Sequence, residues 1–197
     1  MPTDDKHPAR RPAKVVISYH EAGHAVVARK LGVEITGVDM TANNERLANV
    51  QTRSATWVAL QGGGDQVALA RGLYADLMVA VAGVLAQELA GYPARDDFTP
   101  EGEFGRDIDN AIDHAWRLAR IEAGLPIEFG PDEPEELHPG DPLHTAGVAI
   151  IKRAAAETKV LLRDNWLAVV RVAGAFVKHD RLTQTELDHA TALAPQA

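Results

Sequence analysis

A chain of 197 residues is long enough to bury the core of one domain, or at most of two small ones. Its 46% hydrophobic and 24% charged residues are ordinary for a soluble globular protein, and its net charge of −8 argues against a nucleic-acid-binding surface. The absence of cysteine excludes a disulfide scaffold and cysteine-based metal or nucleophile chemistry, and it fits a reducing compartment.

The N-terminal residues are polar and rich in proline, and no apolar stretch of the kind found in a secretory signal follows them. We predict a flexible basic tail over residues 1–12 and a single domain over residues 13–195. The longest apolar stretch, residues 77–86, is far shorter than the roughly 20 residues of a membrane span. The sequence therefore predicts a cytoplasmic protein without a membrane span.

The first half of the domain is expected to contain two long helices with a small sheet between them. Apolar residues recur at helical spacing over residues 13–31, and Gly32 ends the pattern. Three short β-prone segments follow, and we predict that they form the sheet: residues 33–40, 47–52 and 55–60. Asp65 is placed to cap a helix over residues 66–90, which is apolar over much of its circumference and should lie in the core.

The second half is expected to be helical, with two irregular segments. Residues 94–106 lack periodicity and predict a loop, after which Asp107 opens a helix that ends near Ala123. An acidic stretch near residues 131–142 favours an exposed loop. The remaining helices are predicted over residues 143–162, over residues 165–179, and after a capping box of Thr183 and Glu186. The fold class is α+β, mostly helical, with a small sheet beside the first helix.

The first predicted helix contains the sequence HEAGH, in which His20 and His24 lie four residues apart. On an α-helix this spacing places both imidazoles on one face, where they can bind one metal ion. Glu21 projects to the side, where it can hold a metal-bound water and take its proton, as in H-E-x-x-H zinc peptidases. Gly23 costs the helix roughly 1 kcal/mol relative to alanine, which favours a close approach of another backbone or of a substrate there.

Two structural interpretations of the same residues remain open. Glu21 could be the third residue of a capping box that begins at Ser18, in which case the helix would start at Ser18. His20 and His24 could also be ordinary packed or surface histidines. Both interpretations explain the residue types without any metal.

The pattern alone also leaves the third zinc ligand open. The metzincin extension is absent, so the ligand must be a carboxylate or histidine from elsewhere in the chain. Asp107 is one candidate, but an aspartate at this place is equally well explained as a helix N-cap. Glu88 is a second candidate, either as a ligand or as a partner that orients a histidine. His114, two turns after Asp107, could also face the site.

The stretch SYHEAGHAVVA resembles the M41 peptidase family, the zinc protease domain of FtsH-type AAA proteases. Two further segments resemble the family: VAGVLAQEL is similar to its A-G-G-R-x-A-E-E helix, and GRDIDNAIDHA is similar to its S-N-D-[IL]-x-x-A-T-x-x-A motif. The C-terminal residues 160–187 are similar to the closing pattern of the family. The resemblance spans about residues 15–190.

The resemblance implies that His20, His24 and Asp107 bind Zn²⁺ and that Glu21 is the general base of a zinc metalloendopeptidase. It implies an M41-like peptidase fold with unfolded proteins or peptides as substrates, and it allows a homo-oligomer. The cofactor that the sequence predicts is therefore zinc.

The chain departs from the family in two respects. Arg106, Ile112 and Gln87 replace the family's Asn, Thr and first Glu near the expected ligands, which bears on activity and specificity. The sequence also contains no G-x-x-x-x-G-K-[ST] motif, so a motor would have to be a separate ATPase partner. The alternative functions are a catalytically degenerate M41-like domain that binds or regulates another protein, and a peptidase that cuts one specific repressor.

Overall fold

The computed structural model describes residues 14–41, 49–63, 65–92, 105–127 and 138–192. The elements in this part of the chain are mostly helices with one antiparallel pair of strands, which confirms the α+β, mostly helical fold class. They are α1 (Lys14–Leu31), β1 (Ile35–Asp39), β2 (Asn49–Thr52), α2 (Ala55–Gln61), α3 (Gln66–Leu89), α4 (Gly105–Glu122), α5 (Pro142–Asp164), α6 (Trp166–Lys178) and α7 (Gln184–Thr191). The predicted tail and most of the two predicted loops lie outside the described residues.

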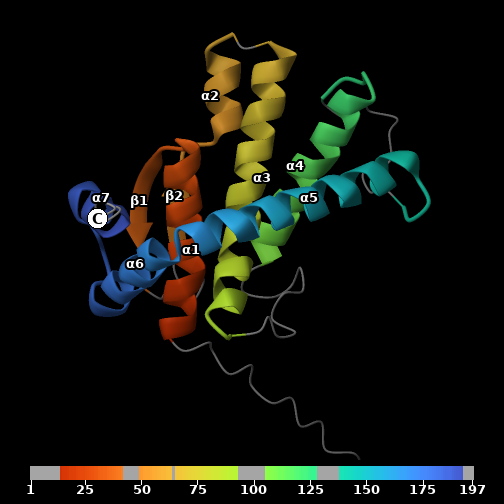
Figure 1. The fold of residues 1–197 in the computed structure, drawn as a ribbon. Helices are drawn as coiled ribbons and strands as arrows, with labels where there is room; N and C mark the ends of the chain where they lie inside the picture. The colour runs from red at the N-terminus through yellow and green to blue at the C-terminus, as the bar shows by residue number, and fades with distance from the viewer. Residues whose placement is uncertain (1–13, 42–48, 64, 93–104, 128–137, 193–197) are drawn as a thin grey trace, which may run out of the picture.

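Helix α1 packs against α3 and α6, and it runs antiparallel to α3 (Figure 1). A Cβ atom at Gly23 would lie 2.5 Å from the carbonyl oxygen of Ala82 and 2.6 Å from Cβ of Ala86. The close approach predicted at Gly23 is therefore confirmed, and the approaching backbone is that of α3. Helices α4 and α5 cover further faces of α3, so α3 lies in the core as predicted.

The sheet beside α1 contains two strands among the described residues, where the sequence predicts three. Strands β1 and β2 pair antiparallel, with Val38 opposite Val50. Strand β2 contacts α1, so the placement of a small sheet beside the first helix is confirmed. The third predicted strand, residues 55–60, is wrong, because this segment forms helix α2.

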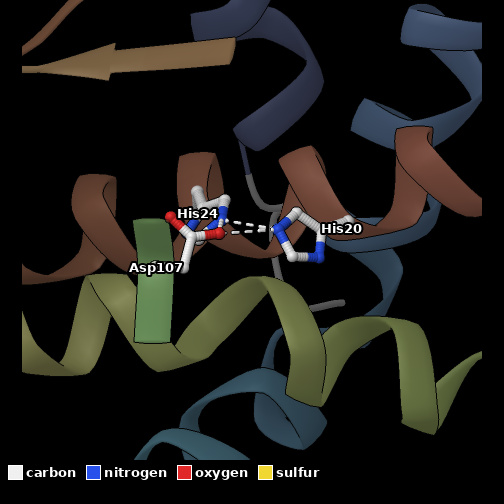
Figure 2. A group of neighbouring side chains, drawn as sticks. All are labelled: His20, His24 and Asp107. Atoms are coloured by element: carbon white, nitrogen blue, oxygen red, sulfur yellow. Dashed lines mark hydrogen bonds and ion pairs between the residues drawn. The ribbon is translucent and has the colours of Figure 1, made fainter. Parts of the chain in front are cut away.

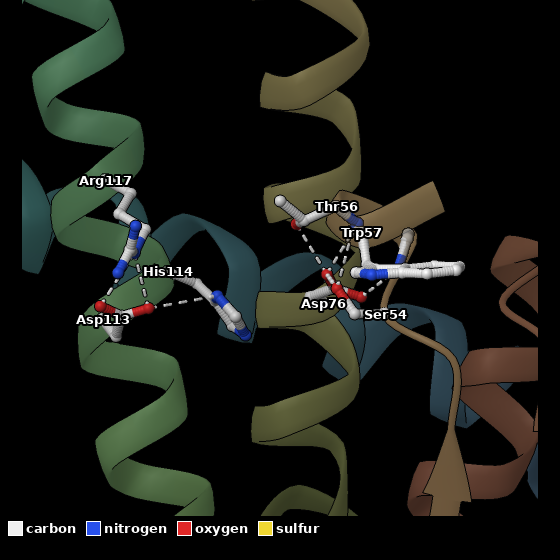
Figure 3. A network of polar contacts seen from close by, with 8 residues as sticks. Ser54, Thr56, Trp57, Asp76, Asp113, His114 and Arg117 are labelled. Atoms are coloured by element: carbon white, nitrogen blue, oxygen red, sulfur yellow. Dashed lines mark hydrogen bonds and ion pairs between the residues drawn. The ribbon is translucent and has the colours of Figure 1, made fainter. Parts of the chain in front are cut away.

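The polar residues at the start of α2 explain why a β-prone segment forms a helix. Ser54 caps α2, since its side chain accepts a hydrogen bond from the Trp57 amide. The carboxylate of Asp76, on α3, accepts four hydrogen bonds from the same turn: Ser54 Oγ at 2.6 Å, Ala55 N at 2.8 Å, Thr56 N at 3.0 Å and Thr56 Oγ1 at 2.7 Å (Figure 3). Because the first amides of a helix lack partners within it, a carboxylate stabilises them, and this contact overrides the β propensity.

Most helix ends follow their sequence signals. Asp65 caps α3 as predicted, and Thr183 and Glu186 form the predicted capping box of α7. Helix α4 differs, because it begins at Gly105 and contains Asp107 within its first turn. The interpretation of Asp107 as the N-cap of this helix is therefore wrong.

Helix α3 is long and apolar enough, by length and composition, to cross a membrane. Half of its most apolar window is buried inside the protein, and the core helix of a soluble protein passes the same test. Localisation and the absence of a membrane span therefore stay predictions.

Replacing Asp76 by alanine is expected to destabilise the protein by about 2–4 kcal/mol, because it leaves several donors at the start of α2 without their acceptor. The matched control is Asp65→Ala, which removes an exposed N-cap and should cost about 1 kcal/mol. Urea unfolding of both variants measures the difference. Equal losses of stability would show that Asp76 does not anchor α2.

Candidate metal centre

Three side chains converge from two helices that are far apart in the sequence. Nε2 of His20, on α1, lies 2.9 Å from Oδ2 of Asp107, on α4, although 87 residues separate them. Nε2 of His24 lies 3.0 Å from Nε2 of His20 and 3.2 Å from the same Asp107 oxygen (Figure 2). Both histidines are buried, at 1% and 7% exposure, while the Asp107 side chain is 31% exposed. The cluster is thus reached by solvent on the Asp107 side.

The spacing of these three atoms fits the ligand set of one metal ion. Tetrahedral zinc ligands at about 2.0–2.1 Å from the ion lie roughly 3.3 Å from one another. The distances of 2.9, 3.0 and 3.2 Å are close to that edge length. Among the described residues, His20, His24 and Asp107 form the one group of three His or carboxylate side chains with this geometry. Two imidazoles and a carboxylate are a donor set that suits zinc.

The orientation of His24 is that of a metal ligand. Its Nδ1 lies 2.7 Å from the backbone carbonyl oxygen of Val79. Because a carbonyl oxygen only accepts, Nδ1 carries the proton, and the neutral ring therefore has its lone pair on Nε2. Metal-bound histidines usually donate their other ring nitrogen in this way.

Helix α3 forms one wall of the cluster through Gly83. A Cβ atom at this position would lie 2.5 Å from Nε2 of His20 and 2.5 Å from Nε2 of His24. This distance is far inside van der Waals contact, so any side chain here would take the space beside the two ligand nitrogens. The glycine thus keeps room beside the donor atoms.

The cluster is also strongly coupled electrostatically. Burial lowers the pKa of His24, but the Asp107 carboxylate, with smaller contributions from Glu21 and the Val79 carbonyl, outweighs it and raises the pKa to about 9. Burial raises the pKa of Asp107, and the two histidines more than offset this, so the pKa lies well below its usual value. The carboxylate therefore stays ionised, and without a metal ion it favours a second proton on Nε2 of His24, which a bound cation would displace.

Glu21 lies beside the cluster and is not one of its three members. Its Oε2 accepts a hydrogen bond of 2.8 Å from the amide of Val50, on β2, and the residue is 6% exposed. The capping-box interpretation is wrong, because α1 begins four residues before Ser18 and Ser18 is buried within it. A carboxylate close to the ligands but outside the ligand set can act on a metal-bound water.

Two other predicted candidates are not brought to the cluster. The carboxylate of Glu88 lies at the surface, 4.0 Å from Nζ of Lys159, so it is neither ligand nor histidine partner. His114 points from α4 toward α3 near the Asp76 network, with Nδ1 3.8 Å from Asp113 (Figure 3). Burial lowers the pKa of His114 despite the nearby carboxylates of Asp76 and Asp113.

Sequence reasoning missed the two backbone contacts of the site. The Val79 carbonyl and the Val50 amide are main-chain groups, and their side chains carry no signal for this role. Gly83 did carry a signal, because glycine inside an apolar helix is costly and marks a close approach.

Comparisons with known proteins do not assign the chain to a family. No protein-family model matches the chain, and no curated protein matches it. The M41 resemblance and the activity that it implies therefore stay predictions, and the functional argument depends on the site itself.

Replacing Gly83 by alanine is expected to lower zinc affinity at least tenfold, a loss of about the size seen when the surroundings of a metal site are disturbed. The added methyl group would displace both ligand nitrogens. Isothermal titration calorimetry with Zn²⁺ measures the change, and the shift of Tm on addition of a chelator gives a second readout.

The matched control is Gly174→Ala on the exposed face of α6, where an added Cβ meets no atom within 4 Å. This variant should bind zinc normally and gain about 0.5–1 kcal/mol of stability from helix propensity. Zinc binding by Gly83→Ala with wild-type affinity would exclude a metal site between the two histidines.

Proposed function

We propose that the protein is a zinc metalloendopeptidase, similar in its site to M41 peptidases, that hydrolyses unfolded proteins or peptides. The observation that carries this proposal is the convergence of His20, His24 and Asp107 at metal-ligand distances with Glu21 beside them. The H-E-x-x-H spacing supplies three of these residues on one helix, and α4 brings the fourth.

The chain's own groups divide the work of hydrolysis. Bound zinc supplies a Lewis acid for the scissile carbonyl and lowers the pKa of the attacking water. His20 and His24 offer Nε2 lone pairs, and the ionised Asp107 supplies negative charge. Glu21 would take the proton of the attacking water on Oε1 while the Val50 amide holds Oε2, and it would then pass the proton to the leaving amine.

One observation favours a second candidate, a catalytically degenerate domain that binds or regulates another protein. The carboxylate of Glu21 is buried and accepts a hydrogen bond from the backbone of β2. In a degenerate domain, the role of this glutamate would be to attach the strand to the helix. In that case the metal would be structural. A separate ATPase partner, a homo-oligomer and a cytoplasmic location stay predictions under either function.

The Glu21→Gln variant separates the two functions. If Glu21 is the base, cleavage of unfolded casein should fall by about 10²- to 10⁴-fold, because glutamine cannot accept the proton, while zinc content stays at the wild-type level. Glu88→Gln is the matched control and should cleave normally, since Glu88 lies at the surface. Equal cleavage by Glu21→Gln and wild type would contradict the proposal.

Replacing Val50 by proline tests whether the strand orients the base. Proline removes the amide that holds Glu21, and loss of a hydrogen bond to a charged group should lower kcat at least about tenfold with little change in KM. Val50→Ala keeps the amide and should retain most of the activity. Zinc content, measured in both variants, reports whether the site is intact. If both variants lose activity equally, the side chain and not the amide is responsible.

A further inference from the structure

His114 is a largely buried histidine in the interface between α3 and α4. Its side chain is 21% exposed, and it points from α4 toward the part of α3 that carries Asp76 (Figure 3). Nδ1 of His114 is buried and has no hydrogen-bond partner among the described residues. The residue lies two turns after Asp107 on α4 and is not a member of the metal cluster, so the proposed reaction makes no use of it.

Two carboxylates face His114, and both already have other partners. Oδ1 and Oδ2 of Asp113 accept hydrogen bonds of 2.9 and 2.8 Å from Nε of Arg117, and Oδ2 lies 3.8 Å from Nδ1 of His114. Asp76 accepts four hydrogen bonds from the first turn of α2, which occupy both of its oxygens. Because 3.8 Å is too long for a hydrogen bond, Nδ1 has no acceptor within reach.

This environment fits the neutral form of the ring. A neutral imidazole with its proton on Nε2 leaves a lone pair on Nδ1, which needs no acceptor, whereas a proton there would be buried without one. Burial lowers the pKa of His114, with Arg117 acting in the same direction, and together they outweigh the carboxylates of Asp76 and Asp113. Helix α5 also packs on α4, but among the described residues it adds no charged group that acts on this ring.

We propose that His114 makes the interface between α3 and α4 pH-sensitive, so that the two helices pack tightly when the ring is neutral and loosen when Nδ1 takes a proton. Because α4 carries Asp107 in its first turn, loosening this interface withdraws the carboxylate from His20 and His24. The effect on the interface is independent of the peptidase proposal. The effect on the metal centre rests on it.

The direction of the pH dependence follows from the lowered pKa of His114. The unfolded chain takes up the proton near the ordinary histidine pKa of about 6.5, and the folded chain takes it up only at lower pH. The contribution of His114 to stability is therefore complete above about pH 6.5 and is lost as the pH falls below it. The pKa of His24 is raised and gives the opposite dependence, so the effect of His114 is measured as a difference between wild type and variant.

Urea unfolding of the metal-free full chain at pH 7.5 and pH 5.5 tests the interface. Leucine cannot be protonated, so between these pH values the unfolding equilibrium constant of His114→Leu should rise at least about threefold less than that of wild type. The matched control is His189→Gln on α7, an exposed histidine, which should follow wild type. An equal pH dependence of wild type and His114→Leu overturns the proposal.

An NMR titration of the wild-type chain gives a second test that needs no variant to fold, beyond one used to assign the signal. The Hε1 resonance of His114, identified by its absence from His114→Gln, should titrate below pH 6.5. A midpoint at or above pH 6.5 refutes the proposal, because the interface would then favour the charged ring.

Zinc retention during acidification tests the consequence for the metal centre. His114→Leu should keep bound zinc to a lower pH than wild type, while His189→Gln should release it at the wild-type pH. Release at the same pH by all three proteins would exclude the effect on the metal centre. Absence of zinc binding at every pH would contradict the proposed function, and the unfolding experiment would still decide the role of His114.

Discussion

The close contact between α1 and α3 is the constraint on which the site depends. Glycines on both helices, Gly23 and Gly83, remove the side chains that would hold the backbones apart. At this separation Nδ1 of His24 lies 2.7 Å from the Val79 carbonyl oxygen, while its Nε2 lies 3.0 Å from Nε2 of His20. The cost of two glycines in helix interiors is therefore offset by tight packing and by a fixed tautomer.

The second constraint is the start of α4. Because the helix begins at Gly105, Asp107 lies in its first turn, where the helix dipole favours a negative charge. The carboxylate is thus stabilised from its own helix and from the histidines of α1, which compensates for its partial burial. A shift of this helix by one residue would rotate the side chain by about 100° and break the cluster.

Sequence patterns predicted the parts of the structure that depend on local spacing. The two histidines, the extent of α3 and the α7 capping box follow from neighbours within four residues. Asp107 could be selected only through the M41 resemblance, since 87 residues separate it from His20 and its N-cap explanation was equally good. The prediction of a strand over residues 55–60 is wrong because the carboxylate that stabilises the first turn of this helix, Asp76, lies on α3. Tertiary contacts of this kind leave no local periodicity.

Two buried carboxylates of this protein show what a purely structural acid looks like and why Glu21 differs. Asp76 is 8% exposed and accepts four hydrogen bonds, which satisfies nearly all of its acceptor capacity. Glu21 is 6% exposed and accepts one, from Val50, among the described residues. Glu21 is next to His20 in the sequence and near His24, so under the proposed peptidase function the attacking water would be a further partner of this carboxylate.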